Sequence, residues 1–314
     1  MTQSFREQLQ SGAQALEIHL TEEQLEQMFD YYRMVIEKNK VMNLTAITEE
    51  SEFVEKHLID SLALVRCPEA AALLYASAKE DIATESDLLL ERNGSAASNA
   101  MESNIQESNV NVPKAEVHKS KRCRQRCDCR AERVLDVGTG AGLPGMVLKI
   151  AFPQLDMTLF DSLQKRLHFL NDCISALQLQ NIRTLHGRAE DYGADRQYRE
   201  TYDLVVSRAV ASLPVLSEYC LPFVHCGGLF VAYKSMEIQE EINASRHAIS
   251  LLGGTLPRDL RYSLPGYNRQ EDGVEQLAEK PDKPGRSLIL IKKVRQTPKQ
   301  YPRRAGTPSK QPLK

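Results

Sequence analysis

Apolar residues recur at helical spacing through the first part of the chain. Thr21 and Gln24 have the spacing of an N-terminal capping box, and an apolar helix face follows them. The sequence NLTAIT (43–48) interrupts this pattern, and a second amphipathic helix is expected near residues 53–65. The pattern therefore predicts a helical region over residues 1–75.

Short apolar runs alternate with helical stretches from residue 133 onward. Helices are expected over GMVLKIAF and over residues 162–177. Strands that alternate with helices indicate βαβ units and a largely parallel sheet, so residues 132–296 are predicted to form an α/β core. The expected strands are VLDVG, MTLFD, IRTLHG, YDLVVS, GGLFVAYK and SLILIKK.

Residues 76–131 differ from both of these regions. Ser, Asn, Glu and Ala dominate as far as Val110, and no aromatic residue occurs in the stretch after Tyr75. Such a composition cannot bury enough apolar surface to offset the entropy lost on ordering. We therefore expect a mostly disordered insertion.

A basic, cysteine-bearing run, KSKRCRQRCDCR (119–130), ends the insertion. Cys123, Cys127 and Cys129 have CxxxCxC spacing, and His118 is the nearest candidate for a fourth zinc ligand. This partial set is too weak to predict a metal site. RNA contact and a featureless loop both remain open interpretations of the run.

Composition favours a cytoplasmic protein without membrane association. Hydrophobic residues make up 42% of the sequence and charged residues 26%, as in ordinary soluble proteins. No apolar run approaches the ~20 residues that span a bilayer, and the polar N-terminus lacks a secretory signal. Four of the seven cysteines stand singly in apolar segments, which indicates reduced, packed thiols. These are Cys67, Cys173, Cys220 and Cys226.

The net charge of −2 is unevenly distributed along the chain. After Asp282 no acidic residue occurs, although Lys and Arg recur to the end of the sequence. A basic C-terminal tail over residues 297–314 suits a phosphate backbone, and a solvated tail without a partner is the alternative.

Three kinds of nucleotide loop compete for GTGAGLPG (138–145). A P-loop is excluded because Met146, and not lysine, follows the last glycine. The GxGxxG spacing of a dinucleotide-binding loop is also present, but it begins later after the strand than this motif requires, and a proline lies within it. A loop for S-adenosylmethionine fits in register, with Asp136 followed by GxGxG directly after the strand. Glycines there let the backbone approach the cofactor without a Cβ in the way.

Acidic residues after the next two strands extend this prediction. Asp161 ends the second strand and is placed to accept hydrogen bonds from ribose hydroxyls. Glu190 and its neighbours follow the third strand, where they could frame an adenine. Three elements at consecutive strand ends favour S-adenosylmethionine over NAD, whose binding by an oxidoreductase is the main alternative.

The loop after the fourth strand, SRAVAS (207–212), bears on the methyl acceptor. It lacks an Asn/Asp-Pro-Pro-aromatic motif and a Pro-Cys pair, so an acceptor that needs no activation, such as guanine N7, is favoured. Arg208 could anchor the cofactor carboxylate or a phosphate, and a surface salt bridge is the alternative. His57 and Asp60 are three positions apart, and a helix-surface hydrogen bond or an RNA contact is preferred to a catalytic pair as their interpretation.

Several segments together resemble the RsmG (GidB) family. They are NLTAIT…KHLIDSL, VLDVGTGAGLPGMVLKIAFP, LFDSLQKRLHFL, HGRAEDYG, DLVVSRAVASLPVLSEYCLP and YPRRAGTPSKQPL, within residues 1–75 and 131–314. The resemblance implies a class I S-adenosylmethionine-dependent methyltransferase, Rossmann-like, with a mostly parallel seven-stranded sheet after a helical region. It also implies formation of 7-methylguanosine in 16S rRNA, with naked rRNA, an assembly intermediate and the small ribosomal subunit all possible acceptors. An RNA-binding protein without turnover is the non-enzyme alternative.

The resemblance also implies site residues, and a monomer is expected. Arg208 would orient the reacting groups without a general base, and it would contact the cofactor. The other implied cofactor-binding residues are Gly138, Gly140, Gly142, Leu143, Asp161, Ser162, Leu163, Ala189 and Glu190. The expected RNA contacts are Lys165, Arg166, Arg303 and Arg304.

Overall fold

The computed structural model describes most of the chain on both sides of residues 77–130. The described residues are 1–76, 131–208, 210–264, 266–268, 276–278 and 285–313. Those before residue 77 and those after residue 130 belong to one compact unit. The predictions made for the insertion, including those for Cys123, Cys127 and Cys129, lie outside the described residues.

Helices fill the N-terminal region, as the apolar pattern predicts. The capping box at Thr21 is confirmed, because its hydroxyl accepts from Gln24 N–H while the Gln24 side chain accepts from Thr21 N–H. The second amphipathic helix is broken into short pieces, with a π-helical turn at its centre. The elements are α1 (Gln3–Gln14), α2 (Glu22–Met42), α3 (Glu50–Phe53), the π-helical turn η1 (Val54–Ile59), α4 (Asp60–Leu62), the 3-10 turn η2 (Ala63–Arg66) and α5 (Pro68–Leu74).

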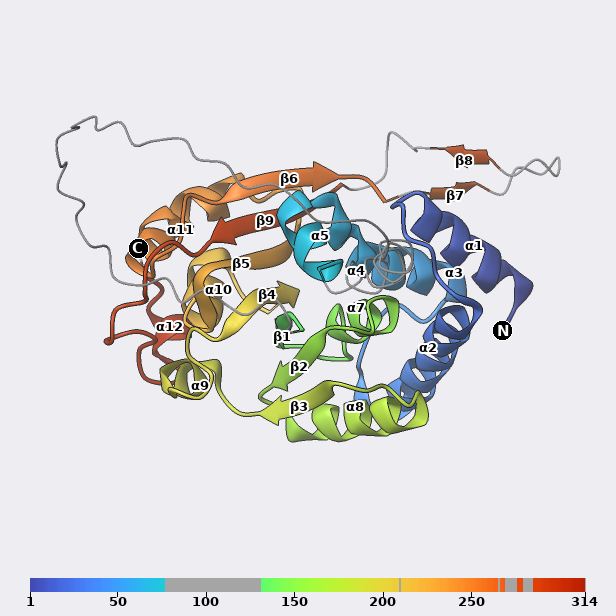
Figure 1. Ribbon diagram of the computed structural model, residues 1–314, viewed down its shortest axis with the longest axis horizontal. Coiled ribbons are helices and arrows are strands. Elements are labelled where there is room, and N and C mark those ends of the chain that lie inside the picture. Colours follow the sequence, from blue (N-terminus) through green and yellow to red (C-terminus); the bar gives the residue numbers. More distant parts are fainter. Residues whose placement is uncertain (77–130, 209, 265, 269–275, 279–284, 314) are drawn as a thin grey trace, which may run out of the picture. The chain divides into compact units, whose positions relative to one another are not determined.

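A seven-stranded sheet in the order β3-β2-β1-β4-β5-β9-β6 forms the centre of the core (Figure 1). β9 is antiparallel to both neighbours and the other six strands run in one direction, so the mostly parallel sheet is confirmed. The sheet strands are β1 (Arg133–Val137), β2 (Asp156–Asp161), β3 (Ile182–His186), β4 (Tyr202–Arg208), β5 (Val224–Ser235), β6 (Arg258–Tyr262) and β9 (Arg286–Lys292). A separate antiparallel pair joins β7 (Gly266–Asn268) and β8 (Gln276–Ala278).

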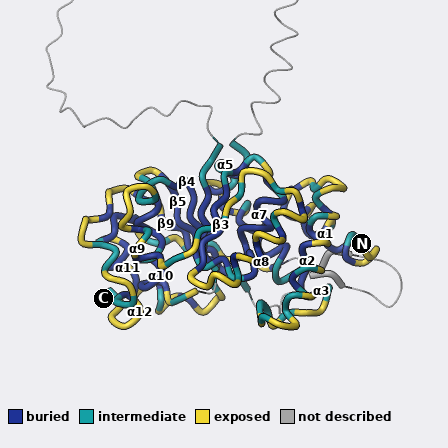
Figure 2. The backbone as a smooth tube through the Cα atoms, turned by 90° about the horizontal axis from the view of Figure 1, so that it is seen from below, coloured by how far each residue is buried: buried dark blue, intermediate teal, exposed yellow. Residues whose placement is uncertain are grey.

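Helices cover both faces of this sheet (Figure 2). Alternate residues of β1 point to opposite faces: Val134 packs with the N-terminal helices, whereas Leu135 and Val137 pack beneath α10. On the first face lie α7 (Gly145–Ala151) and α8 (Gln164–Ala176) together with the N-terminal helices. On the second face lie α9 (Ala189–Ala194), α10 (Leu213–Cys220) and α11 (Gln239–Leu251), with the short α12 (Thr307–Lys310) near the C-terminus.

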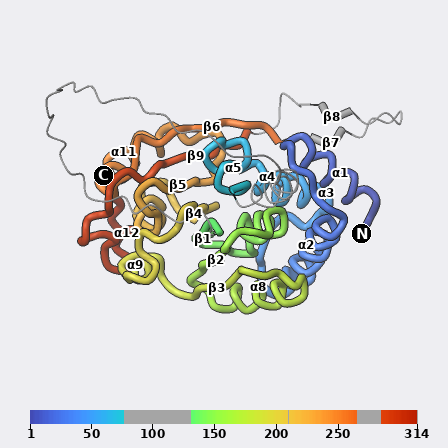
Figure 3. The backbone as a smooth tube through the Cα atoms, viewed as in Figure 1, coloured from blue at the N-terminus to red at the C-terminus, as the bar shows by residue number. Residues whose placement is uncertain are grey.

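The N-terminal helices pack directly against the segment that follows β1 (Figure 3). The buried hydroxyl of Tyr31 in α2 donates to the carbonyl of Ala141 at 2.7 Å. The Gln24 side chain donates to the carbonyls of Ile150 and Ala151, at the end of α7, at 2.9 and 3.1 Å. Through these contacts α2 holds the glycine loop at Ala141 and α7 at its C-terminal end.

One prediction about the cysteines is wrong. Cys67, Cys173 and Cys220 are buried, but Cys226 is exposed. The reason is a register shift between β4 and β5, in which a step of two residues along β4 is matched by a step of five along β5, so the residues around Cys226 leave the regular ladder. Separately, no helix among the described residues is long and apolar enough to cross a membrane.

Candidate active site

The glycine loop after β1 adopts backbone conformations that favour glycine. Gly138 has φ +74° and Gly140 has φ +60°. A Cβ on Gly138 would lie 2.4 Å from Val210 Cγ2, so the loop after β4 approaches this glycine too closely for a side chain. A Cβ on Gly140 would meet only the Gly138 carbonyl, at 3.9 Å, so this glycine borders open space.

Asp161, at the end of β2, holds this loop from the side. Its side chain is 3% exposed, and Oδ2 accepts the Gly140 N–H at 3.0 Å while Oδ1 accepts the Leu163 N–H at 2.8 Å. Arg166 Nη1 lies 3.4 Å from Oδ2. The carboxylate therefore joins the ends of β1 and β2 at one edge of the sheet.

Asp136, the acid of the glycine motif, organises the loop from beneath. Its Oδ2 accepts from the Thr139 hydroxyl at 2.7 Å and from the Gly145 N–H, at the start of α7, at 2.9 Å. Among the described residues, Oδ1 has no hydrogen-bond partner although it is buried. Burial raises the pKa of Asp136 to about 6, while the two hydrogen bonds act in the opposite direction.

A cavity of about 590 Å³ opens where β1, β2 and β3 end, and we call it the strand-end cavity. Five of the predicted cofactor residues line it: Gly138, Asp161, Ser162, Ala189 and Glu190. The cavity also has lining residues that the sequence did not suggest, among them Val210 and Val215, Tyr219 and, near the C-terminus, Ser309.

The strand-end cavity fits the adenosine part of S-adenosylmethionine. Its volume lies within the ~300–1,000 Å³ typical of small-molecule sites. Asp161 supplies a carboxylate where a ribose would lie, and Phe160 and Val215 supply apolar surface for a base. The open backbone at Gly140 lets the amino-acid part of the cofactor approach the loop.

A second cavity, of about 600 Å³, shares Gly138 and Arg166 with the first. The glycine loop contributes part of its wall, including Gly140 and Leu143. The rest comes largely from residues 44–47, η1, α4 and the ends of β4, β5 and β9. We call it the basic cavity, because its lining cations are Lys56, Arg166, Arg208, Lys234 and Arg286.

Two other predicted cofactor residues line neither cavity. A Cβ on Gly142 would lie 2.9 Å from the Tyr31 hydroxyl and 2.5 Å from Met146 Cγ, so this glycine serves loop packing. Leu163 is 43% exposed, and its N–H, not its side chain, takes part in the site through Asp161.

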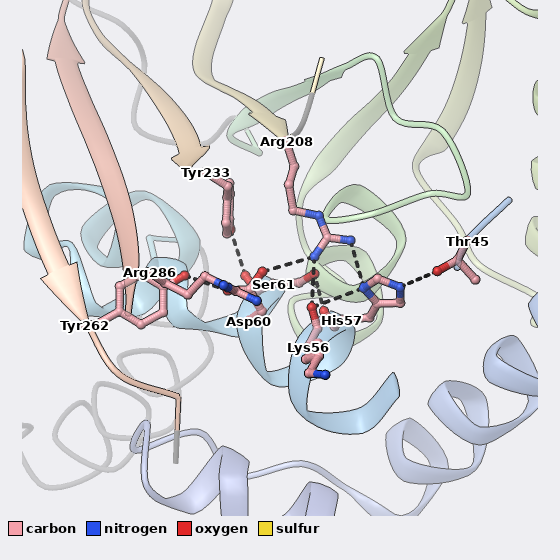
Figure 4. Close-up of polar contacts among 9 residues, drawn as sticks. All are labelled: Thr45, Lys56, His57, Asp60, Ser61, Arg208, Tyr233, Tyr262 and Arg286. Carbon is pink, nitrogen blue, oxygen red and sulfur yellow. Dashed lines mark hydrogen bonds and ion pairs between the residues drawn. The ribbon is translucent and has the colours of Figure 1, made fainter. Parts of the chain in front are cut away.

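Arg208 forms the centre of a polar network in the basic cavity (Figure 4). Its Nη1 donates to Asp60 Oδ2 at 3.2 Å, and the two side chains are 15% and 6% exposed. Asp60 Oδ1 accepts from the Tyr262 hydroxyl at 2.8 Å and lies 3.6 Å from Arg286 Nε. Arg208 therefore forms a salt bridge, as the alternative interpretation expected, but the pair is largely buried and does not lie on the surface.

His57 lies beside the same guanidinium, with Nδ1 3.4 Å from Arg208 Nη2 and Nε2 2.8 Å from Thr45 Oγ1. Burial, reinforced by the Arg208 charge, lowers the pKa of His57 to about 3. The imidazole is therefore neutral at physiological pH. The interpretation of His57 and Asp60 as a helix-surface hydrogen bond is wrong, because both side chains contact the guanidinium of Arg208, which is distant in the sequence.

The π-helical turn is the local feature that the sequence did not reveal. It contains Lys56 and His57 and ends directly before Asp60. A π turn widens the helix locally and recurs at functional sites. The Lys56 carbonyl lies 3.4 Å from Arg208 Nη1, so backbone and side chains of this turn meet the same guanidinium.

The residues expected to contact RNA have different surroundings. Lys165 and Arg304 are exposed, and Arg166 lies where the two cavities meet. Arg303 instead forms an ion pair with Glu218, with Nη2 2.7 Å from Oε2. This pair favours a structural role for Arg303, and RNA contact by all four residues stays a prediction.

The strand order and the strand-end cavity define a class I S-adenosylmethionine-dependent methyltransferase. The sequence also matches the family described as rRNA small subunit methyltransferase G (GidB) over residues 24–74 and 101–258. The chain belongs to this family. The family resemblance identified from the sequence segments is thereby confirmed.

Curated relatives match along nearly their whole length. The ribosomal RNA small subunit methyltransferase G of Lachnoclostridium phytofermentans is 37% identical over 302 residues, covering 96% of this chain and 95% of the relative. That of Acetivibrio thermocellus is 38% identical over 309 residues, covering 98% and 97%. Among solved structures, an S-adenosylmethionine-dependent O-methyltransferase from Thermotoga maritima gives a TM-score of 0.41 at 12% identity, over 53% of this chain and 61% of that one.

Proposed function

We propose that this chain transfers the methyl group of S-adenosylmethionine to N7 of a guanine in 16S rRNA. Family membership supports the cofactor and small-subunit rRNA as the substrate class. The observation that carries the proposal is that the two cavities have Gly138 and Arg166 in common as lining residues. One cavity suits the adenosine of the cofactor, and the other is lined by cations that suit a polyanionic acceptor.

When bound, S-adenosylmethionine supplies a methyl group activated by its sulfonium. In the proposal, Asp161 binds the ribose with Ser162 beside it, while Ala189 and Glu190 frame the adenine. Gly138 and Gly140 border the amino-acid part. Gly142, Leu143 and Leu163 support the loop and Asp161 from outside the strand-end cavity.

The basic cavity suits an acceptor that carries no proton to remove. Among the described residues that line it, His57 has a pKa of about 3 and Asp60 is held by Arg208 and Tyr262, so neither is a good general base near pH 7. Guanine N7 presents a free lone pair and requires no deprotonation. Proximity and alignment then supply most of the catalysis, with Arg208 orienting the reacting groups.

Basic side chains around the cavity would hold the RNA through its phosphates. Lys56, Lys234 and Arg286 line the cavity, and Lys165, next to Arg166 in the sequence, is exposed. Phosphate contacts of this kind position a nucleic acid without reading its sequence. The division into a helical region, an insertion, a core and a tail, the monomeric state and the cytoplasmic location belong to the same proposal.

Labelled S-adenosylmethionine tests this function, with 16S rRNA or small subunits from cells that lack the gene as acceptor. The proposal predicts label in the RNA. An RNA-binding protein without turnover would retain the RNA but transfer no label, and an oxidoreductase would bind NAD in calorimetry. Either result with folded protein would overturn the proposal.

A further inference from the structure

The C-terminal segment reaches the strand-end cavity. Ser309 lines this cavity together with Tyr219 of α10. Three residues earlier, the Gly306 N–H donates to Glu190 Oε1 at 2.8 Å. Glu190 is only 5% exposed and lines the same cavity. The carboxylate expected at the adenine is therefore oriented by a backbone group from the end of the chain.

A buried ion pair fastens this segment to α10. Arg303 donates to Glu218 from Nε at 3.0 Å and from Nη2 at 2.7 Å, and its backbone N–H donates to the same carboxylate at 2.8 Å. The Glu218 side chain is fully buried. A paired-donor contact of this kind fixes both position and orientation. Because α10 also carries Val215 and Tyr219, the pair attaches the segment to a helix that lines the cavity.

A second anchor lies upstream of Arg303. Arg199 donates to the carbonyls of Thr297 and Tyr301 at 2.6 and 2.8 Å. The Thr297 N–H donates to Glu200 Oε1 at 2.6 Å. The chain is thus held before it reaches Gly306, and the residues that follow lie against the cavity and do not extend as a free tail.

We propose that residues 305–313 form a wall of the strand-end cavity at the adenine end of the cofactor, with the Gly306 N–H as the group that positions Glu190. This inference rests on the proposed function, since it assumes that S-adenosylmethionine occupies this cavity. It gives the C-terminal segment a role in cofactor binding, whereas its charge alone left an RNA contact and a solvated tail as the alternatives.

Deletion of residues 305–314 tests the inference, because it removes Gly306 and Ser309 but keeps the Arg303 and Arg199 anchors. Calorimetry with S-adenosylmethionine, without RNA, measures the affinity. We expect binding at least about tenfold weaker than that of the full chain, or ~1.4 kcal/mol. Unchanged cofactor affinity together with weaker rRNA binding would overturn the inference and make the segment an RNA contact.

A point variant covers the case in which the deletion fails to fold. Ser309→Phe places a large side chain at the cavity wall, and Lys310→Phe adds the same side chain at the next, also exposed, position, which does not line the cavity. We expect Ser309→Phe alone to weaken cofactor binding, with both variants melting near the unmodified protein. Equal affinities for the two variants would overturn the inference. If the unmodified chain itself failed to bind S-adenosylmethionine, the proposed function would fail instead.

Discussion

Arg208 Nη1 lies 3.2 Å from Asp60 Oδ2, although the two residues are 148 positions apart in the sequence. The contact ties the end of β4 to the residue that follows the π-helical turn. Because the pair lies in the basic cavity, it determines where the guanidinium points relative to the glycine loop. The helical region is therefore part of the site as well as a support for the core.

Arg208→Lys tests the importance of this geometry. Lysine keeps the charge but loses the planar set of donors that reaches Asp60 and the Lys56 carbonyl together. At saturating cofactor we expect the methyl-transfer rate to fall by at least about tenfold, or ~1.4 kcal/mol in the barrier. Single-turnover kinetics measure this rate.

Arg261→Lys provides the control for that variant, because Arg261 is exposed and pairs with Asp259 outside both cavities. Its rate should equal that of the unmodified protein. Equal rates for both variants would show that the planar set of donors of Arg208 has no special role in methyl transfer.

Asp161→Ala should weaken S-adenosylmethionine binding by about tenfold or more, since a hydrogen bond to a charged group contributes ~1.5–3 kcal/mol. The change also removes the acceptor for the Gly140 and Leu163 N–H groups. Asp156→Ala, at the opposite end of β2, is the matched control and should bind normally. Calorimetry gives both affinities, and equal values would mean that the ribose is held elsewhere.

Tyr31→Phe removes the buried hydrogen bond from α2 to the Ala141 carbonyl. We expect the free energy of unfolding to fall by ~1 kcal/mol or somewhat more, because a buried carbonyl loses its donor. Cofactor affinity should fall with it, since Ala141 belongs to the glycine loop. Tyr32→Phe is the control, because its hydroxyl makes an exposed 3.5 Å contact to the Thr48 carbonyl and has no other hydrogen bond among the described residues. Denaturant titration that gives the two variants equal stability would contradict this support role.

His57 makes stability depend on pH. Its pKa in the folded chain is about 3 and the ordinary value is 6.5, so the unfolded state binds more protons between these values. The stabilising contribution is complete above pH 6.5 and declines as the pH falls toward 3. Asp136, whose pKa is raised to about 6, acts in the opposite direction between its ordinary 3.8 and 6. Because His57→Gln removes the imidazole but keeps Asp136, comparing the stability of this variant with that of the unmodified protein isolates the contribution of His57.

Urea denaturation at pH 7.5 and pH 5 measures this dependence. The unmodified protein should lose more stability on acidification than His57→Gln does. Equal losses would show that His57 titrates near its ordinary pKa in the folded protein.

Local signals in the sequence predicted the cofactor side of the site. The glycine loop and Asp161 lie within one βαβ unit, where loop chemistry and strand ends follow directly from the residue pattern. The capping box at Thr21 is local in the same way. The edge strand β6 was missed because Arg258–Tyr262 is rich in charged residues and only partly buried, which hides its alternation.

Contacts between distant segments could not be predicted in this way. The Arg208–Asp60 pair depends on a π-helical turn that no simple periodicity marks. Charge alone placed Arg303 in a basic tail, either in contact with RNA or solvated without a partner. The signal that could have corrected this was Glu218, a single acid within the apolar run LPVLSEYC, because a buried carboxylate requires a partner.

The methylated atom is the most direct test of the central claim. Small-subunit rRNA from cells lacking the gene, treated with the protein and S-adenosylmethionine, can be digested to nucleosides and analysed by mass spectrometry against methylguanosine standards. We predict 7-methylguanosine with the unmodified protein and at least about tenfold less with Arg208→Lys in the same time. Methylation at another atom, or no methylguanosine with folded, cofactor-binding protein, would contradict the account.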